Sequence, residues 1–317
     1  MKQPMKPSEA AVAAWLTQHA HPVDVLDPEA PTDDLSPLDE LVRNAEIVAL
    51  GVSSRATREL SVAQHRLVRR LVEEHGFRSL LLEGDDPARL GLDAYVLTGA
   101  GDPAALLSGA RSFWRTEEIL GTLRWLRARN ARHPDDPVRL AVPPSGAAVP
   151  ATGLAEIERG LARDAIRWRE QAKAPGGTVY WGGTAHTAVG DPRTVSDPGR
   201  QTHRNAGGQL REHFGPAYVS VGLSFHHGGQ HPDPAPEFAE SALGRAGLPA
   251  YLLDLRAPRP ADVDAWFRTP TRTRLVGPGH DPRDDAAHHL SGGSLSDFFD
   301  AFVHVREVTG ARVLTDR

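Results

Sequence analysis

The sequence predicts an α/β protein: a mainly parallel central sheet with helices on both faces. Short apolar runs rich in β-branched residues alternate with stretches in which apolar residues recur at helical spacing. Such alternation of strands and helices is typical of a parallel sheet covered on both faces. At 317 residues and 40% hydrophobic content, the chain is long for one core but still compatible with it. We therefore expect a single domain over residues 1–317.

The first strand–helix–strand unit gives the clearest pattern. Residues 46–52 (EIVALGV) are a buried-strand run, and residues 53–76 carry an amphipathic helix that stops near Gly76. Residues 77–85 (FRSLLLEGD) are the second strand, and the crossover between them is expected to be right-handed. Residues 1–24 are a helical lead-in. Further strands are predicted over 137–143, 178–183, 218–225 and 249–256, and further helices over 113–131, with Thr116 as its cap, and 154–172.

Two stretches, 187–209 and 226–236, are poor in apolar periodicity and rich in Gly, Pro, His and Asp. We interpret both as loops. In an open α/β sheet, loops at the carboxyl ends of the strands form the ligand site, so this edge is where function is expected.

Composition excludes several classes of protein. The chain has no cysteine, which excludes disulfides, thiolate catalysis and Cys-based metal sites. The net charge is −5 and no basic run occurs, so nucleic acid is not an expected partner. Mean hydropathy is −0.38 and no apolar run approaches the roughly 20 residues of a membrane span. The first residues are typical of an amphipathic helix and not of a signal peptide, and we expect a cytoplasmic protein that has no membrane partner.

Polar side chains gather just after four predicted strands. They are Ser53 to Glu59, Glu83 to Asp86, Trp181 to His186, and His226 to Gly229. For Glu83, the alternatives to a functional role are capping of the following helix and a structural ion pair with Arg58 or Arg78. His65 lies on the apolar face of its helix and is interpreted as a core histidine. His186 is the best candidate for a functional histidine.

No metal or cofactor is expected. The pairs His226-His227 and His288-His289 are adjacent, and adjacent side chains on a strand point to opposite faces. His227 and His231 are four residues apart, but in a Gly/Pro loop where no helix aligns them. The glycine pairs lack the strand–GxGxxG–helix context of nucleotide binding, and no GxSxG elbow of a serine hydrolase occurs.

Several long segments resemble the erythromycin esterase family. They are DDLSPLDELVRNAEIVALG, QHRLVRRLVEEHGFRSLLLEGD, YVLTGAGDPAALLSGARSFWRTEEILGTLRWLRARNA, LARDAIRWREQAKAPGGTVYWGGTAH and GGQLREHFGPAYVSVGLSFHHG. The resemblance runs over roughly residues 25–310. It implies an α/β fold and hydrolysis of a macrolide lactone, with histidine activating water and carboxylates orienting it. Residues that match the family pattern are Arg58, Glu59, Glu83, Trp114, Glu117, Arg163, Asp164 and His186.

The chain departs from the family at its main water-activating motif. Where the family has Gly-Glu-x-x-His-Gly, this sequence reads Gly51 to Ala56, with Val52 and Arg55 in place of the glutamate and the histidine. The family's Trp-Ala-His-Asn-x-His is reduced to Trp181 and His186. The acidic residue after the third strand is lost within 142–145, and the helical insert before residue 178 is shortened. Arginine stays protonated, so Arg55 cannot act as a base, although it can bind a carboxylate or stabilise an oxyanion.

Three hypotheses follow. The first is a natural-product tailoring enzyme that cyclises, dehydrates or isomerises a polyketide-like or acyl small molecule by proton transfer. The second is a non-catalytic ligand-binding pseudoenzyme, and the third is an ester or lactone hydrolase that uses His186 as base. We predict Glu83 and His186 as the catalytic pair, and as substrate-binding residues Arg55, Arg58, Glu59, Trp114, Glu117, Trp181 and His226.

Overall fold

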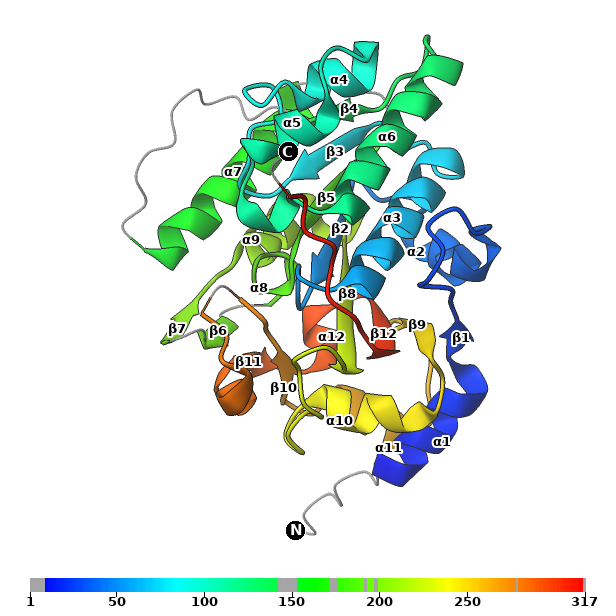
Figure 1. The fold of residues 1–317 in the computed structure, drawn as a ribbon. Helices are drawn as coiled ribbons and strands as arrows, with labels where there is room; N and C mark the ends of the chain where they lie inside the picture. The colour runs from blue at the N-terminus through cyan, green and yellow to red at the C-terminus, as the bar shows by residue number, and fades with distance from the viewer. Residues whose placement is uncertain are drawn as a thin grey trace.

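The central element of the fold is an eight-stranded sheet. The computed structural model describes residues 9–141, 153–171, 176–190, 193–196, 199–277 and 279–315. The strand order is β1-β9-β12-β8-β2-β5-β3-β4, and every neighbouring pair from β12 to β4 is parallel (Figure 1). β9 runs antiparallel to both β12 and β1. The strands are β1 His21–Pro22, β2 Ile47–Val52, β3 Ser79–Leu82, β4 Arg139–Leu140, β5 Thr178–Gly183, β8 Tyr218–His227, β9 Ala250–Asp254 and β12 Ala301–Glu307.

Helices surround this sheet. Within the described residues, no helix combines the length and the apolar composition of a membrane span. The α-helices are α1 Glu9–His19, α2 Asp39–Val42, α3 Arg58–Glu73, α4 Leu92–Thr98, α5 Pro103–Ser108, α6 Glu117–Arg132, α7 Leu154–Gln171, α8 Thr184–Thr187, α9 Ala206–Phe214, α10 Ala239–Leu243, α11 Ala261–Phe267 and α12 Leu295–Phe298. Short 3₁₀ turns include η2 Ser112–Trp114 and η5 Pro282–Ala287.

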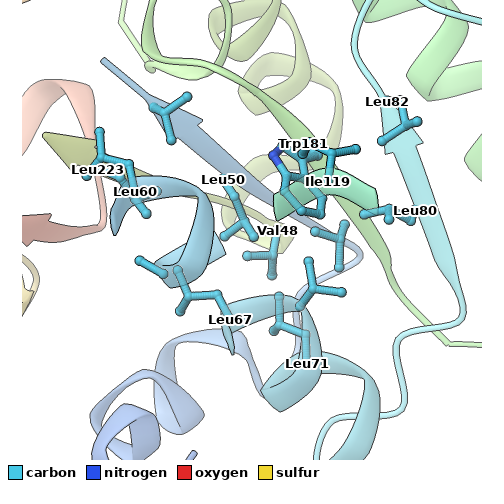
Figure 2. Packing of buried hydrophobic residues seen from close by; sticks show 14 of the residues in the cluster. Val48, Leu50, Leu60, Leu67, Leu71, Leu80, Leu82, Ile119, Trp181 and Leu223 are labelled. Atoms are coloured by element: carbon cyan, nitrogen blue, oxygen red, sulfur yellow. The ribbon is translucent and has the colours of Figure 1, made fainter. Parts of the chain in front are cut away.

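Both faces of the central strands are buried, as the near-continuous apolar runs predict. Along β2, Val48 and Leu50 pack against α3 and α6, whereas Ile47 and Ala49 pack on the opposite face with α7 and α9. Figure 2 shows the first face, where the leucines of α3 meet the side chains of β2, β3 and β5. This alternation confirms the predicted parallel sheet with helices on both faces.

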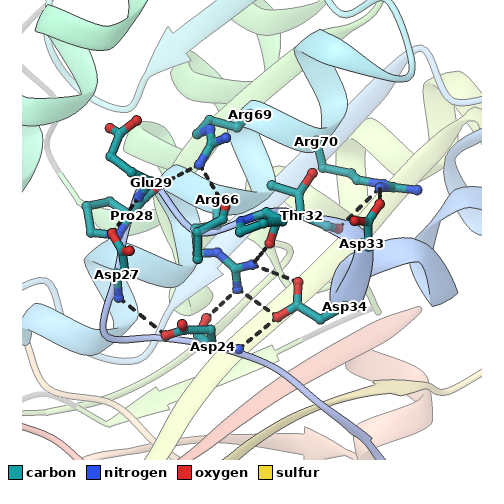
Figure 3. A network of polar contacts seen from close by, with 12 residues as sticks. Asp24, Asp27, Pro28, Glu29, Thr32, Asp33, Asp34, Arg66, Arg69 and Arg70 are labelled. Atoms are coloured by element: carbon teal, nitrogen blue, oxygen red, sulfur yellow. Dashed lines mark hydrogen bonds and ion pairs between the residues drawn. The ribbon is translucent and has the colours of Figure 1, made fainter.

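An arginine-rich side of α3 holds the N-terminal segment 24–34 (Figure 3). Arg66 donates to both carboxylate oxygens of Asp34, at 2.9 and 2.7 Å, and also contacts the carbonyls of Asp24 and Pro31. Arg69 donates to the carbonyl of Pro28 at 2.6 Å. Arg66 is 1% exposed, so both faces of α3 are covered: one by the sheet and one by this segment.

The strands predicted at 46–52, 77–85, 178–183, 218–225 and 249–256 are confirmed with small shifts at their ends. Of the strand predicted at 137–143, β4 covers Arg139–Leu140, and residues 142 and 143 lie outside the described part of the chain. The helix predicted at 113–131 begins at Glu117, after the 3₁₀ turn η2, and the Thr116 hydroxyl accepts from the Ile119 N–H as expected of its cap. The last strand of the sheet, β12, was not predicted.

The prediction of a loop over 187–209 is wrong. This stretch contains β6 Arg193–Ser196, β7 Arg200–His203 and the start of α9. The two strands form a hairpin in a second, four-stranded antiparallel sheet, β10-β11-β6-β7, with β10 Thr271–Arg274 and β11 His289–Gly293. The two strands have four residues each, and β7 is mostly exposed, so they carry no apolar alternation. The other partner of β6, β11, lies far away in sequence, so the sequence has no local signal for this sheet. The single-domain organisation over 1–317 stays a prediction.

Candidate active site

The carboxyl ends of three neighbouring strands bring polar side chains together. Register pairs Val52 of β2 with Gly183 of β5, and Leu82 of β3 with Trp181 of β5. The residues that follow these strands therefore leave the sheet at one edge. Arg55, Glu83 and His186, each predicted from its place after a strand, come together there, with Glu83 in contact with both of the others.

Glu83 lies at the centre of the site and is 4% exposed. Its Oε1 pairs with Nη2 of Arg55 and lies 3.6 Å from Nε2 of His186. Its Oε2 accepts from the backbone N–H of Gly183 at 3.1 Å. The carboxylate thus lies between two cationic side chains, and its ion pair is with Arg55. The alternative partners considered from sequence bind elsewhere: Arg78 pairs with Asp136 and Arg58 with Glu59.

A second carboxylate, Glu158 of α7, supports His186 from the other side. Nδ1 of His186 lies 2.7 Å from Oε1 of Glu158, and Oε2 of Glu158 accepts from the Ala206 N–H at 2.8 Å. His203 also lies within 3.7 Å of this carboxylate. Glu158 is completely buried, so every one of these partners is needed to compensate its lost hydration.

These contacts shift the pKa values of both groups. Burial alone would lower the pKa of His186, but the carboxylates of Glu83 and Glu158 outweigh burial and raise it to about 9. Burial alone would raise the pKa of Glu158, but His186, His203 and the Ala206 N–H together lower it to about 2. At neutral pH, His186 is therefore an imidazolium that carries protons on both ring nitrogens.

Sequence reasoning missed Glu158, although a signal for it exists. Glu158 shares one helix face with Ala162 and Ala165, at spacings of four and seven residues, and all three are buried. A carboxylate on the apolar face of a helix requires a buried partner, which here is His186.

Aromatic side chains cover Arg55. Its guanidinium carbon lies 4.1 Å from the ring centre of Phe113 and 5.1 Å from that of Trp114. Trp114 in turn meets Trp181 edge-on at 6.1 Å, and Nε1 of Trp181 donates to Oε1 of Gln64 at 2.6 Å. Trp114 and Trp181, both predicted as substrate-binding residues, thus form a wall beside Arg55.

A small cavity lies between these groups. It is lined by Arg55, Ser61, Gln64, Phe113, Trp114, Ile119, Trp181 and Gly182, and its volume of about 10 Å³ is room for a single water molecule. The second terminal nitrogen of Arg55, Nη1, is buried and has no hydrogen-bond partner among the described residues.

Three other predicted site residues lie apart from Glu83 and contact the ends of the chain. Glu59 accepts from the Thr309 backbone N–H and hydroxyl, at 2.6 and 2.7 Å, and Arg58 donates to the Leu26 carbonyl at 2.8 Å. Glu117 is exposed at the start of α6. The described contacts of Arg58 and Glu59 are structural, while their role in substrate binding stays a prediction. The departure from the family within 142–145 falls outside the described residues.

His226 lies at the end of β8, in a histidine cluster of its own. Its Nδ1 is 2.9 Å from Nδ1 of His227, and both nitrogens lie within 3.8 Å of the Asp233 carboxylate. The expectation that these adjacent rings point to opposite faces is wrong, because their Nδ1 atoms meet at the end of the strand. His65 is buried against Trp125, as predicted for a core histidine, and burial lowers its pKa to about 3.

Comparisons with known proteins agree with this architecture. A family model described as "Erythromycin esterase" matches residues 72–142 and 154–308. An "Erythromycin esterase type II" of Escherichia coli is 26% identical over 116 residues, which are 37% of this chain and 27% of that protein. The chain therefore matches only about a quarter of the length of that relative.

Solved structures share the fold at low sequence identity. A protein from Bacillus cereus covers 97% of this chain and 100% of its own, with a TM-score of 0.79 and 21% identity. A structure described as a succinoglycan biosynthesis protein covers 99% and 100%, with a TM-score of 0.81 and 19% identity. An erythromycin esterase mutant in its open conformation covers 94% and 99%, with a TM-score of 0.61 and 15% identity.

Proposed function

The chain belongs to the erythromycin esterase family, and within it we propose an enzyme that works by proton transfer and not by ester hydrolysis. Its substrate would be a polyketide-like or other acyl small molecule of natural-product metabolism, which it cyclises, dehydrates or isomerises. The observation that carries the proposal is the row of alternating charges Arg55, Glu83, His186 and Glu158 at the carboxyl edge of the sheet.

In this proposal His186 is the acid. With a pKa of about 9, it holds both ring protons at neutral pH, and Glu158 retains the one on Nδ1. The proton on Nε2 is then the one available to a substrate. Glu83, 3.6 Å from that nitrogen, receives a proton from another position of the same substrate. One proton given and one taken leave the total number of protons on the enzyme unchanged, and transfer of the new proton from Glu83 to Nε2 of His186, 3.6 Å away, restores both groups for the next turnover. This balance fits an isomerisation, a cyclisation or a loss of water.

Arg55 has the role of an anchor. Its guanidinium remains protonated at any working pH, so it cannot activate water as the family's histidine is expected to. Its Nη1, which has no hydrogen-bond partner in the described part of the chain, and the water-sized cavity beside it suit an anionic oxygen atom of the substrate. Val52, 3% exposed where the family carries a glutamate, adds no second carboxylate. These two substitutions argue against ordinary hydrolysis.

A non-catalytic binding protein is the second candidate, and one observation favours it. The ion pair between Arg55 and Glu83 is formed directly, between side chains that are 17% and 6% exposed. The oxygen of Glu83 that would receive a proton is already bonded to Arg55, and the site then serves to hold an anionic ligand. The cytoplasmic location and the absence of nucleic-acid and membrane partners also remain proposals.

The test is a ligand screen by thermal shift with macrolides, lactones and linear polyketide acids, followed by mass spectrometry of every hit. We expect a product of unchanged mass or one that has lost water. Glu83→Gln and His186→Gln should abolish turnover while still binding the ligand. His213→Gln is the matched control. His213 lies on the surface of α9, where it pairs with Glu170 of α7, so this variant should keep full turnover.

The alternatives give different results in the same screen. A product that has gained water, and that disappears in His186→Gln, would replace the proposal by the hydrolase. A stabilising ligand that is recovered intact would support the binding protein. Turnover that survives in both Glu83→Gln and His186→Gln would place the chemistry elsewhere.

A further inference from the structure

The end of β8 gathers three potential metal ligands on a short stretch of chain. His226 and His227 are its last two residues, and Asp233 follows six residues later. The chain reverses between them: Gly228 and His231 exchange backbone hydrogen bonds of 3.1 and 3.0 Å. Gly228 has a φ of +125°, and a Cβ there would lie 2.1 Å from the Val308 carbonyl, so this turn requires glycine. The turn brings Asp233 back over the histidines.

The three ligand atoms form a compact triangle. Nδ1 of His226 and Nδ1 of His227 are 2.9 Å apart, and they lie 3.8 and 3.7 Å from Oδ1 of Asp233. The circle through three points with these separations has a radius of about 2.0 Å, which is the length of a zinc bond to imidazole nitrogen or carboxylate oxygen. The three separations therefore allow one ion to contact all three atoms at the length of a zinc bond.

We propose that His226, His227 and Asp233 bind a divalent transition-metal ion, with Zn²⁺ as the best fit. Two imidazoles and one carboxylate suit zinc, and they disfavour magnesium and calcium, which prefer oxygen ligands alone. The site is separate from Glu83 and His186, and the proposal does not depend on the proposed function.

The protein holds the backbone of this site in place. Arg274, fully buried, donates to the carbonyl of His226 at 2.6 Å and to that of Pro232 at 2.8 Å. Arg274 therefore fixes the backbone directly before His227 and directly before Asp233. The His227 side chain is 34% exposed and that of Asp233 is 79% exposed, so an ion enters from solvent and water completes its coordination.

A neighbouring cluster, His231, His280 and Asp285, is a weaker candidate. There Asp285 already pairs with the guanidinium of Arg274 at 2.8 Å and with His280 at 2.9 Å. A metal ion bound by Asp285 would therefore lie close to the positive charge of Arg274, which is paired with the same carboxylate. At the end of β8, by contrast, Arg274 binds backbone carbonyls and leaves the three ligand atoms free.

The experiment is calorimetric titration of the untagged, EDTA-treated chain with Zn²⁺, together with the visible spectrum of the Co²⁺-loaded protein. We expect one ion per chain and a spectrum typical of tetrahedral cobalt. His227→Ala and Asp233→Asn should each weaken binding at least about tenfold, because even losing a residue that only orients a ligand costs that much. Circular dichroism of each variant checks that it is folded.

Two controls make the outcome decisive. His213→Ala removes a half-exposed histidine of α9 and should leave the affinity unchanged. His280→Ala tests the neighbouring cluster. Loss of binding in His280→Ala but not in His227→Ala would overturn the proposal, and so would a folded chain that binds Zn²⁺ no better than its His227→Ala variant.

Discussion

Two buried carboxylates, Glu83 and Glu158, determine the protonation of His186. Glu158 has no exposed surface and three polar partners, one of which is the imidazole of His186. The imidazolium of His186 thus lies between two carboxylates, those of Glu158 and Glu83. The imidazole ring is therefore charged at neutral pH.

Removing the negative charge of Glu158 should make His186 easier to deprotonate. In Glu158→Gln, we expect the pKa of His186 to fall from about 9 by at least about one unit, because one of its two favourable carboxylates is lost. The shift is measured by NMR titration of the imidazole C–H signals, with His186→Gln to assign the resonance. Glu170→Gln, which alters only the surface partner of His213, should leave the value of His186 unchanged.

The same pKa shift predicts how stability depends on pH. The pKa of His186 is raised on folding, so its stabilisation is fully present below about pH 6.5 and is lost as pH rises through about 9. The contribution is up to about 3 kcal/mol. Urea unfolding at a series of pH values should show this decline in the wild type, and His186→Gln should show a flatter profile over the same range. Parallel profiles would contradict it.

Gly182 illustrates a residue whose small size the site requires. A Cβ at this position would lie 2.3 Å from Oε2 of Glu83 and 2.7 Å from Cε1 of Tyr180. Gly182→Ala should destabilise the protein by about 1–3 kcal/mol and displace the Glu83 carboxylate. Gly121→Ala is the matched control: it lies inside α6 with nothing within 4 Å of the added Cβ, and should stabilise by about 0.5–1 kcal/mol. Both are measured by denaturant unfolding.

At the scale of elements, α3 connects the sheet to the N-terminal segment. Its leucines pack on β2 and β5, while Arg66, Arg69 and Arg70 on the other side bind residues 24–39. A helix with so many charges looks solvent-facing in sequence. The structure buries the arginine side because the N-terminal segment supplies carbonyls and carboxylates to match it.

Arg66→Ala should be strongly destabilising. It leaves the Asp34 carboxylate and the carbonyls of Asp24 and Pro31 without their donor, at a cost of about 3 kcal/mol. Arg43→Ala serves as control, since Arg43 and its partner Glu40 are 66% and 77% exposed, and the change should stay below about 1 kcal/mol. Equal midpoints of thermal unfolding for the two variants would show that the N-terminal segment adds little stability.

At the scale of the whole molecule, the segment that follows β12 fastens the candidate site. Residues 308–315 pass along the start of α3 and then reach the start of α6 (Figure 1). The Ala311 N–H donates to the Ala56 carbonyl and the Leu314 N–H to the Arg115 carbonyl, both at 2.9 Å. Residues 308–315 therefore hold both the turn that carries Arg55 and the segment that carries Phe113 and Trp114.

Weakening the contacts of residues 308–315 should lower the free energy of unfolding of the whole fold. Thr309→Ala removes the hydroxyl that donates to the buried Glu59 at 2.7 Å, and should cost about 1–2 kcal/mol. Thr269→Ala removes a hydroxyl that bonds only within its own exposed helix end, and should change the free energy of unfolding by less than about 0.5 kcal/mol. Denaturant unfolding of both variants provides the comparison.

Local pattern in the sequence determined the parallel strands and their helices. The runs at 46–52 and 178–183 are apolar on both faces, and α3 and α6 carry clear stripes, so short-range physics specifies them. The place of Arg55, Glu83 and His186 after such strands is enough to predict that they meet. The motif substitutions at Val52 and Arg55 are also plain in the sequence.

Tertiary structure decided what depends on contacts between distant residues. Glu158 and His186 are 28 positions apart, and the β6–β7 hairpin pairs with a strand nearly 100 residues later, so neither pairing can be identified from local sequence pattern. The contact between the rings of His226 and His227 is visible only in the folded chain, and the pKa of His186 depends on two carboxylates from other elements. Side-chain charge and spacing are local properties, whereas partner choice and burial are properties of the folded chain.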